Sequence, residues 1–308
     1  MAKVFNATVQ SGKVSGTNSN FPAYVDLSKL PADFWDTVSN GGGDIRVYTD
    51  SGLTTEIARE VVSCNTSTDK GELWCKVGSM TSSTELYIKV DGTSSDYAVD
   101  ATYGAQNTWN SDYVGVYHFK QDPTGSETVK DSTSRGNHFN SYNMDSGNRV
   151  AGKIGDCYNF NGTDEYLDHS SPSTDFRFTT NMTLGVWVNA DVLEYWQQVL
   201  TRQHGTGGGD SYLIGFSGTD YAIYGKSWQY NADKTTGTWY NLTFTKDSAT
   251  EKQFLNGERV NQTTTAETTL DNDDNATTIG AQENGTPGVT EYFNGKIGEI
   301  HISKITRS

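Results

Sequence analysis

The chain has 308 residues and a formal net charge of −15. So large an excess of negative charge disfavours binding to nucleic acid phosphates and to anionic lipid surfaces. No run of about 18 apolar residues occurs in the sequence, so a membrane-spanning helix is not expected. The 32 glycines and only 5 prolines, among many Thr, Ser and Asn residues, indicate short strands joined by polar turns.

Cysteine usage and the N-terminus bear on where the protein acts. Cys64, Cys75 and Cys157 are too few for a disulfide framework. Cys64 and Cys75 are placed to face each other across a hairpin, but free thiols on buried faces are the expected state. The first residues lack the apolar h-region of a secretory signal. We therefore expect a protein released by lysis, as a virion protein is, or one whose export segment is missing from this sequence.

The first part of the chain predicts a small β-domain with one short helix. Runs bounded by Ser, Thr, Gly and Asp predict strands at residues 3–10, 21–27, 44–49, 56–64, 72–77 and 85–90. Residues 30–38 are predicted to be helical, because Pro31 suits a first helical turn and Asp33 the positive end of the helix dipole. Trp35 and Trp74 are expected in the core of this domain.

From Trp109 onwards, longer strands with Trp and Tyr residues follow one another closely. Strands are expected at residues 114–119, 158–160, 182–189, 196–202, 212–216, 221–224, 239–246, 251–255 and 295–302. Asn256-Gly257 and Asn294-Gly295 are each predicted to form a type I′ hairpin turn. This density of strands predicts one large β-sandwich. The domain boundary is placed after residue 108, giving domains at 1–108 and 109–308.

Four segments of the second part carry a family pattern. They are residues 115–119 with the loop Asp-Ser-Thr-Ser-Arg-Gly-Asn at 131–137, residues 153–167, the Trp strand at 182–188, and residues 239–257 with the terminal strand. In this order they resemble the laminin-G-like, concanavalin A-type lectin/glucanase superfamily. The resemblance implies an all-β fold, in which a small β-sandwich domain precedes a concanavalin A-like jelly-roll β-sandwich of the laminin-G type.

The first 108 residues are themselves similar to a small β-domain of uncharacterised function that often precedes such lectin-like domains. Residues 21–27, 43–47 and 71–74 carry this likeness. Together the two resemblances imply an outward-facing, modular protein of bacteria or their phages. Because this superfamily includes lectins, hydrolases and inert structural modules, its fold alone does not give a function.

Hydrolase chemistry would need a pair of carboxylates. Glucanases of this superfamily carry a Glu-x-Asp-x-Glu strand, because retaining hydrolysis requires two carboxylates about 5 Å apart and alternate strand residues share one face. The nearest stretch begins at Glu299, but His301 and Ser303 stand where the acids should be. The sequence therefore predicts a protein that is not an enzyme. A glycoside hydrolase with a divergent site is the alternative from another functional class.

Calcium is the candidate cofactor, because several lectin-like relatives bind Ca²⁺ near the rim of the sandwich. Asp164 lies at the matching turn, and Asp273 belongs to the oxygen-rich run 271–275. Such oxygen ligands suit Ca²⁺. The run has no EF-hand spacing, however, and clusters of Asp and Asn also form ordinary turns.

Sugar binding would need exposed aromatic rings that stack on pyranose faces, and polar groups for the hydroxyls. The candidates flank the Gly-rich loop 204–210, and they are Tyr195, Trp196, Trp228 and Tyr230. Trp187 and Trp239 lie in alternating strands, and both are expected to pack in the core.

The leading hypothesis is a non-catalytic, outward-facing protein, a phage virion component that decorates the particle or attaches it to host glycans. Its expected partners are glycans or a host-surface polysaccharide, other virion proteins, and further copies of the chain in a homo-oligomer. Its expected location is the virion surface, or else the extracellular space or cell surface. The alternative hypothesis is a secreted bacterial carbohydrate-binding module or adhesin.

Overall fold

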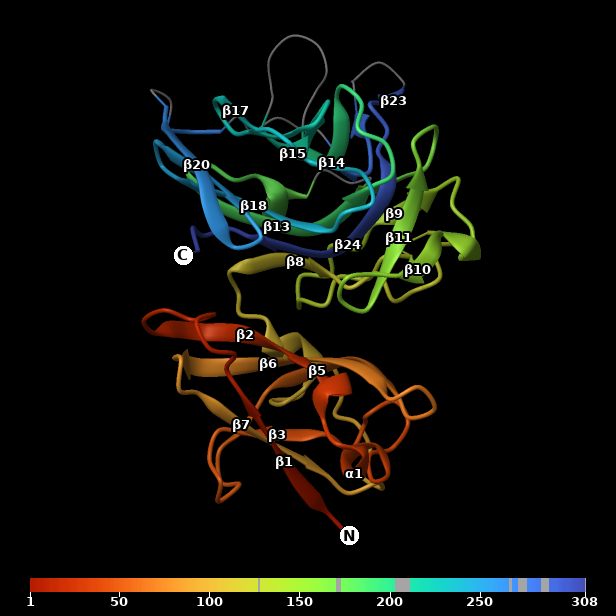
Figure 1. Cartoon of the computed structure of the whole chain (residues 1–308), viewed down its shortest axis with the longest axis vertical. Coiled ribbons are helices and arrows are strands. Elements are labelled where there is room, and N and C mark those ends of the chain that lie inside the picture. Colours follow the sequence, from red (N-terminus) through yellow and green to blue (C-terminus); the bar gives the residue numbers. More distant parts are fainter. Residues whose placement is uncertain are drawn as a thin grey trace. The chain divides into compact units, whose positions relative to one another are not determined.

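The computed structural model describes residues 1–126, 128–169, 173–202, 211–265, 268–270, 276–283 and 288–307. Two compact units make up the chain, and strands dominate both of them (Figure 1). The first unit comprises Met1–Ser111 with Ser132–Ser134, and the second comprises Asp112–Asp131 with Arg135–Ser308. The all-β fold class predicted from the sequence is confirmed. The division into domains after residue 108 stays a prediction.

The first unit is built from two small antiparallel sheets. Its elements are β1 (Lys3–Thr8), β2 (Asn18–Asp26), η1 (Leu27–Lys29), α1 (Ala32–Trp35), β3 (Arg46–Tyr48), β4 (Glu56–Ile57), β5 (Arg59–Asn65), β6 (Lys70–Met80), β7 (Glu85–Val90) and η2 (Ala105–Thr108). One sheet has the order β1-β7-β3-β4 and the other the order β2-β6-β5. Their inward side chains and those of α1 form one hydrophobic core. Trp35 and Trp74 are buried, as predicted.

The helix of the first unit is shorter than its sequence predicts. Only Ala32–Trp35 is α-helical, and Pro31 is the N-cap residue without a side-chain cap. Phe34 and Val38 are buried in the core, so packing rather than helix propensity fixes this segment. The described residues contain no helix whose length and apolar character would let it cross a membrane.

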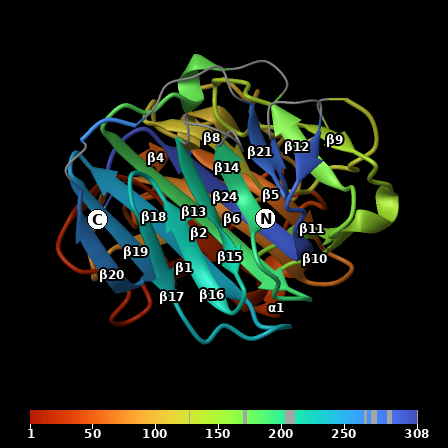
Figure 2. The same ribbon diagram turned by 90° about the horizontal axis from the view of Figure 1, so that it is seen from above.

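The second unit contains two larger sheets. Its elements are β8 (Tyr113–Tyr117), β9 (Asn140–Tyr142), η3 (Ser146–Asn148), β10 (Arg149–Ala151), β11 (Asp156–Asn161), β12 (Tyr166–His169), η4 (Thr174–Phe176), β13 (Asn181–Ala190), β14 (Gln197–Arg202), β15 (Tyr212–Ser217), β16 (Asp220–Tyr224), β17 (Trp228–Asn231), β18 (Tyr240–Asp247), β19 (Thr250–Leu255), β20 (Glu258–Thr264), β21 (Thr277–Ile279), β22 (Gln282–Glu283), β23 (Val289–Thr290) and β24 (Asn294–Ser303). One sheet has the order β10-β11-β24-β13-β18-β19-β20, with β8 also paired to β24. The other has the order β17-β16-β15-β14-β21-β12-β9, and Figure 2 shows β17 to β14 side by side.

The core of the second unit lies between the facing sides of these two sheets. From β24 it receives Ile300 and Ile302, which occupy alternate positions of that strand. Trp187 and Trp239 are not among the core residues, which corrects the prediction made for both. Trp187 alternates with the buried Val186 and Val188, so it lies on the outward side of β13.

One of the two predicted hairpin turns is present. Leu255 pairs with Glu258, so Asn256-Gly257 forms the two-residue loop, with φ angles of 52° and 85°. The second prediction is wrong, because Asn294 and Gly295 lie inside β24. A Cβ on Gly295 would lie 2.4 Å from the carbonyl oxygen of Asn189, so a close backbone approach, not a turn, requires this glycine.

The three cysteines are free and buried, as expected. In the β5–β6 hairpin Cys64 pairs with Gly71 and Cys75 with Arg59. The two cysteines therefore do not face each other. Burial raises the pKa of the Cys64 thiol to about 11 and that of Cys75 to about 12, so neither is a reactive thiolate near neutral pH.

Candidate functional site

Aromatic rings gather on the outward face of the second unit at the end where β17 forms the sheet edge. Trp228 and Tyr230 alternate with the buried Gln229, so both point outward, and they are 37% and 42% exposed. Their rings are stacked, with centroids 5.9 Å apart and planes 12° apart. Trp196 and Tyr224 each lie 5.0 Å from Trp228, measured between ring centroids. We call these four side chains the aromatic platform.

Three of the four sugar-binding candidates from the sequence therefore come together, and Tyr195 does not join them. Tyr195 is 78% exposed, and no ring contact within the described part of the chain links it to the aromatic platform. The sequence did not single out Tyr224. The feature that could have identified Tyr224 is the short β16–β17 hairpin, in which Tyr224 pairs with Trp228 across the strands.

Trp196 has a backbone conformation that tryptophan rarely adopts. Its φ angle is +60°, in the left-handed region, immediately before β14 begins at Gln197. A bulky residue in this region is strained, and such strain persists only where the surrounding structure fixes it. The conformation accompanies a contact between this indole ring and that of Trp228.

A buried carboxylate supports the turn that carries the aromatic platform. Glu251 on β19 accepts hydrogen bonds from the backbone N–H of Lys226, at 2.8 Å, and from the hydroxyl of Ser227, at 3.1 Å. Lys246 on β18 neutralises it through an ion pair of 3.0 Å in which neither side chain is exposed. A Cβ on Gly225 would lie 2.6 Å from the carboxylate of Glu251. Glu251 thus fixes the turn before Trp228 from the interior of the second unit.

The face of the sheet that carries the aromatic platform can be followed from strand to strand through the paired residues. Tyr224 pairs with Leu213, Leu213 with Thr201, Thr201 with Thr278, and Thr278 with Asp168. Side chains that are paired in this way share one face. Leu213, Thr201 and Thr278 are each no more than 1% exposed. The middle of the face is therefore closed to solvent, and the platform lies at one end of it.

The opposite end of this face holds a second aromatic group. Tyr142 on β9 and Tyr166 on β12 pair across the strands, and their rings are stacked 4.5 Å apart with planes 3° apart. Burial raises the pKa of Tyr166 to about 12, and burial also raises the pKa of Asp168. No sequence motif indicated this group, because the two tyrosines are 24 residues apart and meet only through strand pairing.

Of the two candidate calcium ligands, Asp164 is the one that the structure describes. One carboxylate oxygen of Asp164 accepts a hydrogen bond of 2.8 Å from the side-chain amide of Asn161. The amide oxygen of Asn161 in turn accepts the backbone N–H of Thr163, at 2.8 Å. No cluster of three acidic, His or Cys ligand atoms among the described residues contains Asp164. Asp273 lies outside the described residues. Calcium binding stays a prediction.

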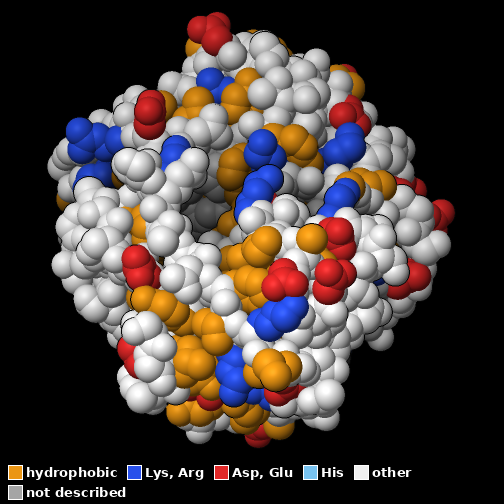
Figure 3. All heavy atoms as spheres, turned by 60° about the horizontal axis from the view of Figure 1, so that its bottom comes forward, with side chains coloured by type: hydrophobic (Ala, Val, Ile, Leu, Met, Phe, Trp, Pro, Cys, Tyr) orange, Lys and Arg blue, Asp and Glu red, His pale blue; other side chains and the backbone are white. Residues whose placement is uncertain are grey.

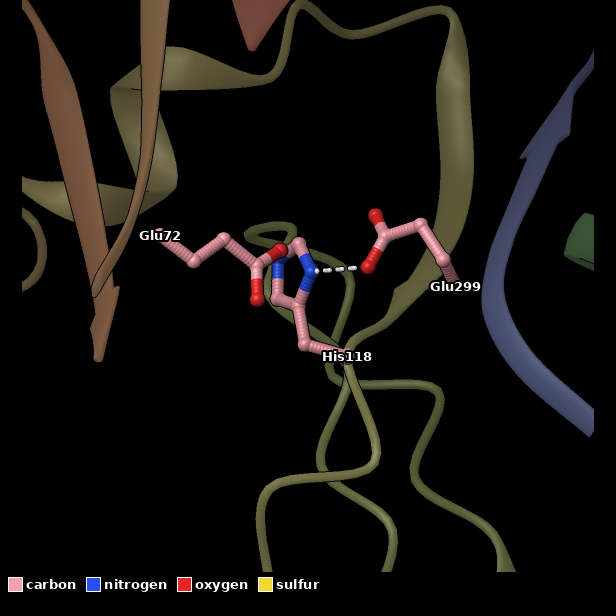
Figure 4. A group of neighbouring side chains, drawn as sticks. All are labelled: Glu72, His118 and Glu299. Carbon is pink, nitrogen blue, oxygen red and sulfur yellow. Dashed lines mark hydrogen bonds and ion pairs between the residues drawn. The ribbon is translucent and has the colours of Figure 1, made fainter. Parts of the chain in front are cut away.

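Glu299, the acid nearest to a glucanase pattern, is buried and engaged by two histidines. Its carboxylate lies 2.8 Å from Nδ1 of His118 and 2.6 Å from Nε2 of His301, and Figure 4 shows the contact with His118. Glu299 is 5% exposed. Burial opposes its ionisation, yet the charges and hydrogen bonds of both histidines lower its pKa to about 2. Glu299 thus has the environment of a structural anion.

Comparison with known proteins gives a family for the second half of the chain. Residues 161–308 match the family described as the concanavalin A-like lectin/glucanases superfamily. A search of curated proteins gives no match.

Several solved structures are similar in fold at low sequence identity. Domain 4 of AbnA, a GH43 extracellular arabinanase from Geobacillus stearothermophilus in complex with arabinotriose, is 18% identical with a TM-score of 0.47, over 64% of this chain and 94% of that chain. The binding domain of Paraclostridial Mosquitocidal Protein 1 is 9% identical with a TM-score of 0.47, over 64% of this chain and 50% of that one. A botulinum neurotoxin type C structure, described by its interaction with two ganglioside molecules, is 10% identical with a TM-score of 0.45. The match covers 64% of this chain and 49% of that one.

The match thus spans about half the length of the last two proteins. At these scores the similarity transfers no ligand to this chain. The family match and the sandwich of two facing sheets agree with the resemblance found in the sequence. Residues 161–308 therefore form a domain of the concanavalin A-like lectin/glucanases superfamily.

Proposed function

We propose that the second unit binds carbohydrate through the aromatic platform. The observation that carries this proposal is the stacked pair of Trp228 and Tyr230, both exposed on one face, with a third ring, that of Trp196, against Trp228. Exposed aromatic rings on a sheet are costly unless they meet a partner. Their flat faces suit the apolar faces of sugar rings.

The support beneath the platform fits a binding role. A recognition surface gains affinity when its rings are already held in place before the ligand arrives. Glu251 fixes the turn before Trp228 through two hydrogen bonds. Tyr224 adds a ring contact of 5.0 Å to the same indole.

The proposed role is attachment without catalysis. Glu299 is buried between two histidines, which leaves it poorly placed to protonate a glycosidic oxygen. We place the protein on an outer surface, as a decoration or host-attachment component of a phage particle. A secreted adhesin with the same platform would bind in the same way.

Glycan-array binding of the purified full chain, with calcium and then with EDTA, tests this proposal. The expected result is binding to a restricted set of glycans that is lost in Trp228→Ala and kept in Trp187→Ala. Trp187 is the matched control, because it lies on the outward side of the other sheet, on β13. Binding that requires calcium would bring Asp164 into the site. No binding in either condition would contradict the proposal, and it would favour a purely structural decoration.

A further inference from the structure

The first unit has an open groove between the edges of its two sheets. β1 is the edge of one sheet and β2 the edge of the other, and the groove between them has a volume of about 790 Å³. Apolar side chains from both sheets line it, among them Ala7, Ala23, Val25 and Leu86. Part of the core side of the first unit is therefore open at this edge.

Exposed apolar side chains accompany the groove. Phe21 and Tyr24 on β2 line the groove and are 36% and 38% exposed. Figure 3 shows hydrophobic side chains gathered on the surface with Lys and Arg side chains beside them. Contiguous apolar surface of this kind marks interaction sites in soluble proteins.

The backbone of β1 has hydrogen-bonding groups that face this open edge. The bond from the N–H of Val9 to the carbonyl of Thr84, at 3.4 Å, makes Thr8 and Glu85 a non-hydrogen-bonded pair of the β1–β7 ladder. By alternation, the N–H and C=O groups of Val4, Asn6 and Thr8 all point away from β7. None of the described residues donates to or accepts from these groups. β1 also has no bulge, no proline and no left-handed residue to protect its edge.

The facing edge of β2 is different, because Pro22 lies within that strand, opposite Lys76 of β6. Proline has no N–H to donate, so it interrupts any ladder formed on this edge. Of the two edges beside the groove, β1 is thus the one that can accept another strand.

We propose that the first unit binds an extended segment of a partner protein by adding it as a strand to β1. The segment lies about 4.8 Å from β1, and its alternate side chains enter the groove towards Val25 and Leu86. This mode combines main-chain hydrogen bonds, which give affinity, with side-chain pockets, which give specificity.

Charge decides which kind of segment fits. Lys13 and Lys29 line the groove and are exposed. The carboxylate of the lining Asp26 lies 3.8 Å from the ammonium group of Lys29, so the groove keeps an excess of one positive charge, that of Lys13. The partner strand is therefore apolar at the positions that face the groove and acidic at one or more others. A second copy fits less well, because β1 itself, Lys3–Thr8, contains no acidic residue, and two copies each carry a net charge of −15.

Selection from a random library of nine-residue peptides on the immobilised full chain tests the proposal. Enriched peptides are then measured by fluorescence anisotropy against the wild type and against Asn6→Pro and Asn6→Ala. Asn6 belongs to a non-hydrogen-bonded pair with Tyr87, so proline removes a donor that β7 does not use. We expect alternating apolar and acidic peptides, with about fivefold weaker binding to Asn6→Pro and unchanged binding to Asn6→Ala.

A second variant keeps the test decisive if Asn6→Pro does not fold. The double variant Lys13→Glu/Lys29→Glu should also weaken binding at least fivefold, and Lys70→Glu, an exposed lysine outside the groove, is its control. Failure to enrich alternating peptides, or equal binding to all variants, would overturn the proposal. Concentration-dependent dimers of the wild type that Asn6→Pro abolishes would overturn it too, because the occupant would then be a second copy.

Discussion

The ammonium group of Lys246 and the carboxylate of Glu251 form an ion pair of 3.0 Å with no solvent exposure on either side chain. The two residues are also cross-strand partners of β18 and β19. Lys246 follows Leu242 and Phe244 at alternate positions of β18, and both of these are core residues. This ion pair is thus part of the interior on which the β16–β17 turn rests.

We expect Glu251→Gln to lower the free energy of unfolding by about 3 kcal/mol, because it leaves the charge of Lys246 buried without a partner. Urea denaturation at neutral pH measures this change. The double variant Lys246→Met/Glu251→Gln should recover most of the loss, since no buried charge is then unpaired. A Glu251→Gln protein as stable as the wild type would show that the ion pair contributes nothing.

Trp228→Ala should weaken glycan binding by about 2 kcal/mol, which is about thirtyfold in Kd, because Trp228 is the ring that contacts the other three platform side chains. Isothermal titration with a glycan selected on the array measures the change. Trp228 is partly exposed, so the melting temperature should change little. A thirtyfold loss in Trp187→Ala as well would mean that binding does not depend on the platform.

The stability of the chain should depend on pH through Glu299. The pKa of this carboxyl is lowered from an ordinary value of 4.5 to about 2 in the folded state. A lowered pKa stabilises the fold above pH 4.5, and this stabilisation is lost as the pH falls from 4.5 through 2. It amounts to about 3 kcal/mol.

Urea denaturation of the wild type and of Glu299→Gln, at pH 7 and again at pH 3, measures this effect. The difference in stability between the two proteins should shrink at pH 3, because the carboxyl then takes up a proton in the unfolded wild type, where its pKa is the ordinary 4.5, but stays ionised in the folded wild type, where its pKa is about 2. The other carboxyl groups titrate in both proteins, so their contribution cancels in the difference between the two free energies of unfolding. A difference that is the same at both pH values would exclude a stabilising role for the Glu299 charge.

Gly295→Ala should destabilise the second unit by about 3 kcal/mol. The new methyl group would lie 2.4 Å from the carbonyl oxygen of Asn189, and the φ angle of +139° is unfavourable for alanine. Gly185→Ala is the matched control, because the nearest atom to its Cβ would be 3.7 Å away in the adjoining strand, and it should change stability by less than about 1 kcal/mol. Thermal unfolding of both variants checks this; equal losses would contradict the role given to Gly295.

Hairpins with a local signal were predictable, and contacts between distant segments were not. Asn256-Gly257 forms its turn because the flanking strands β19 and β20 pair directly. Asn294-Gly295 has the same dipeptide, but β24 pairs there with β11 and β13, far away in the sequence. Tertiary pairing thus overrides a local turn preference.

The candidate site divides in the same way. Trp196, Trp228 and Tyr230 were candidates from the sequence because they are aromatic residues flanking the loop 204–210. Their contacts with one another, and the contribution of Tyr224, depend on how β14, β15, β16 and β17 are ordered. Nothing in the composition indicated that Glu251, a charged residue, would be buried beneath the β16–β17 turn.

The sequence by itself determined the all-β class, the family of residues 161–308 and the alternation that buries Ile300 and Ile302, because these depend on periodicity and on local motifs. Only the tertiary structure decided the gathering of the aromatic platform, the burial of Lys246 with Glu251 and the open edge of β1. These depend on which strands become neighbours and which remain at an edge, and that choice is made by packing between residues far apart in the chain.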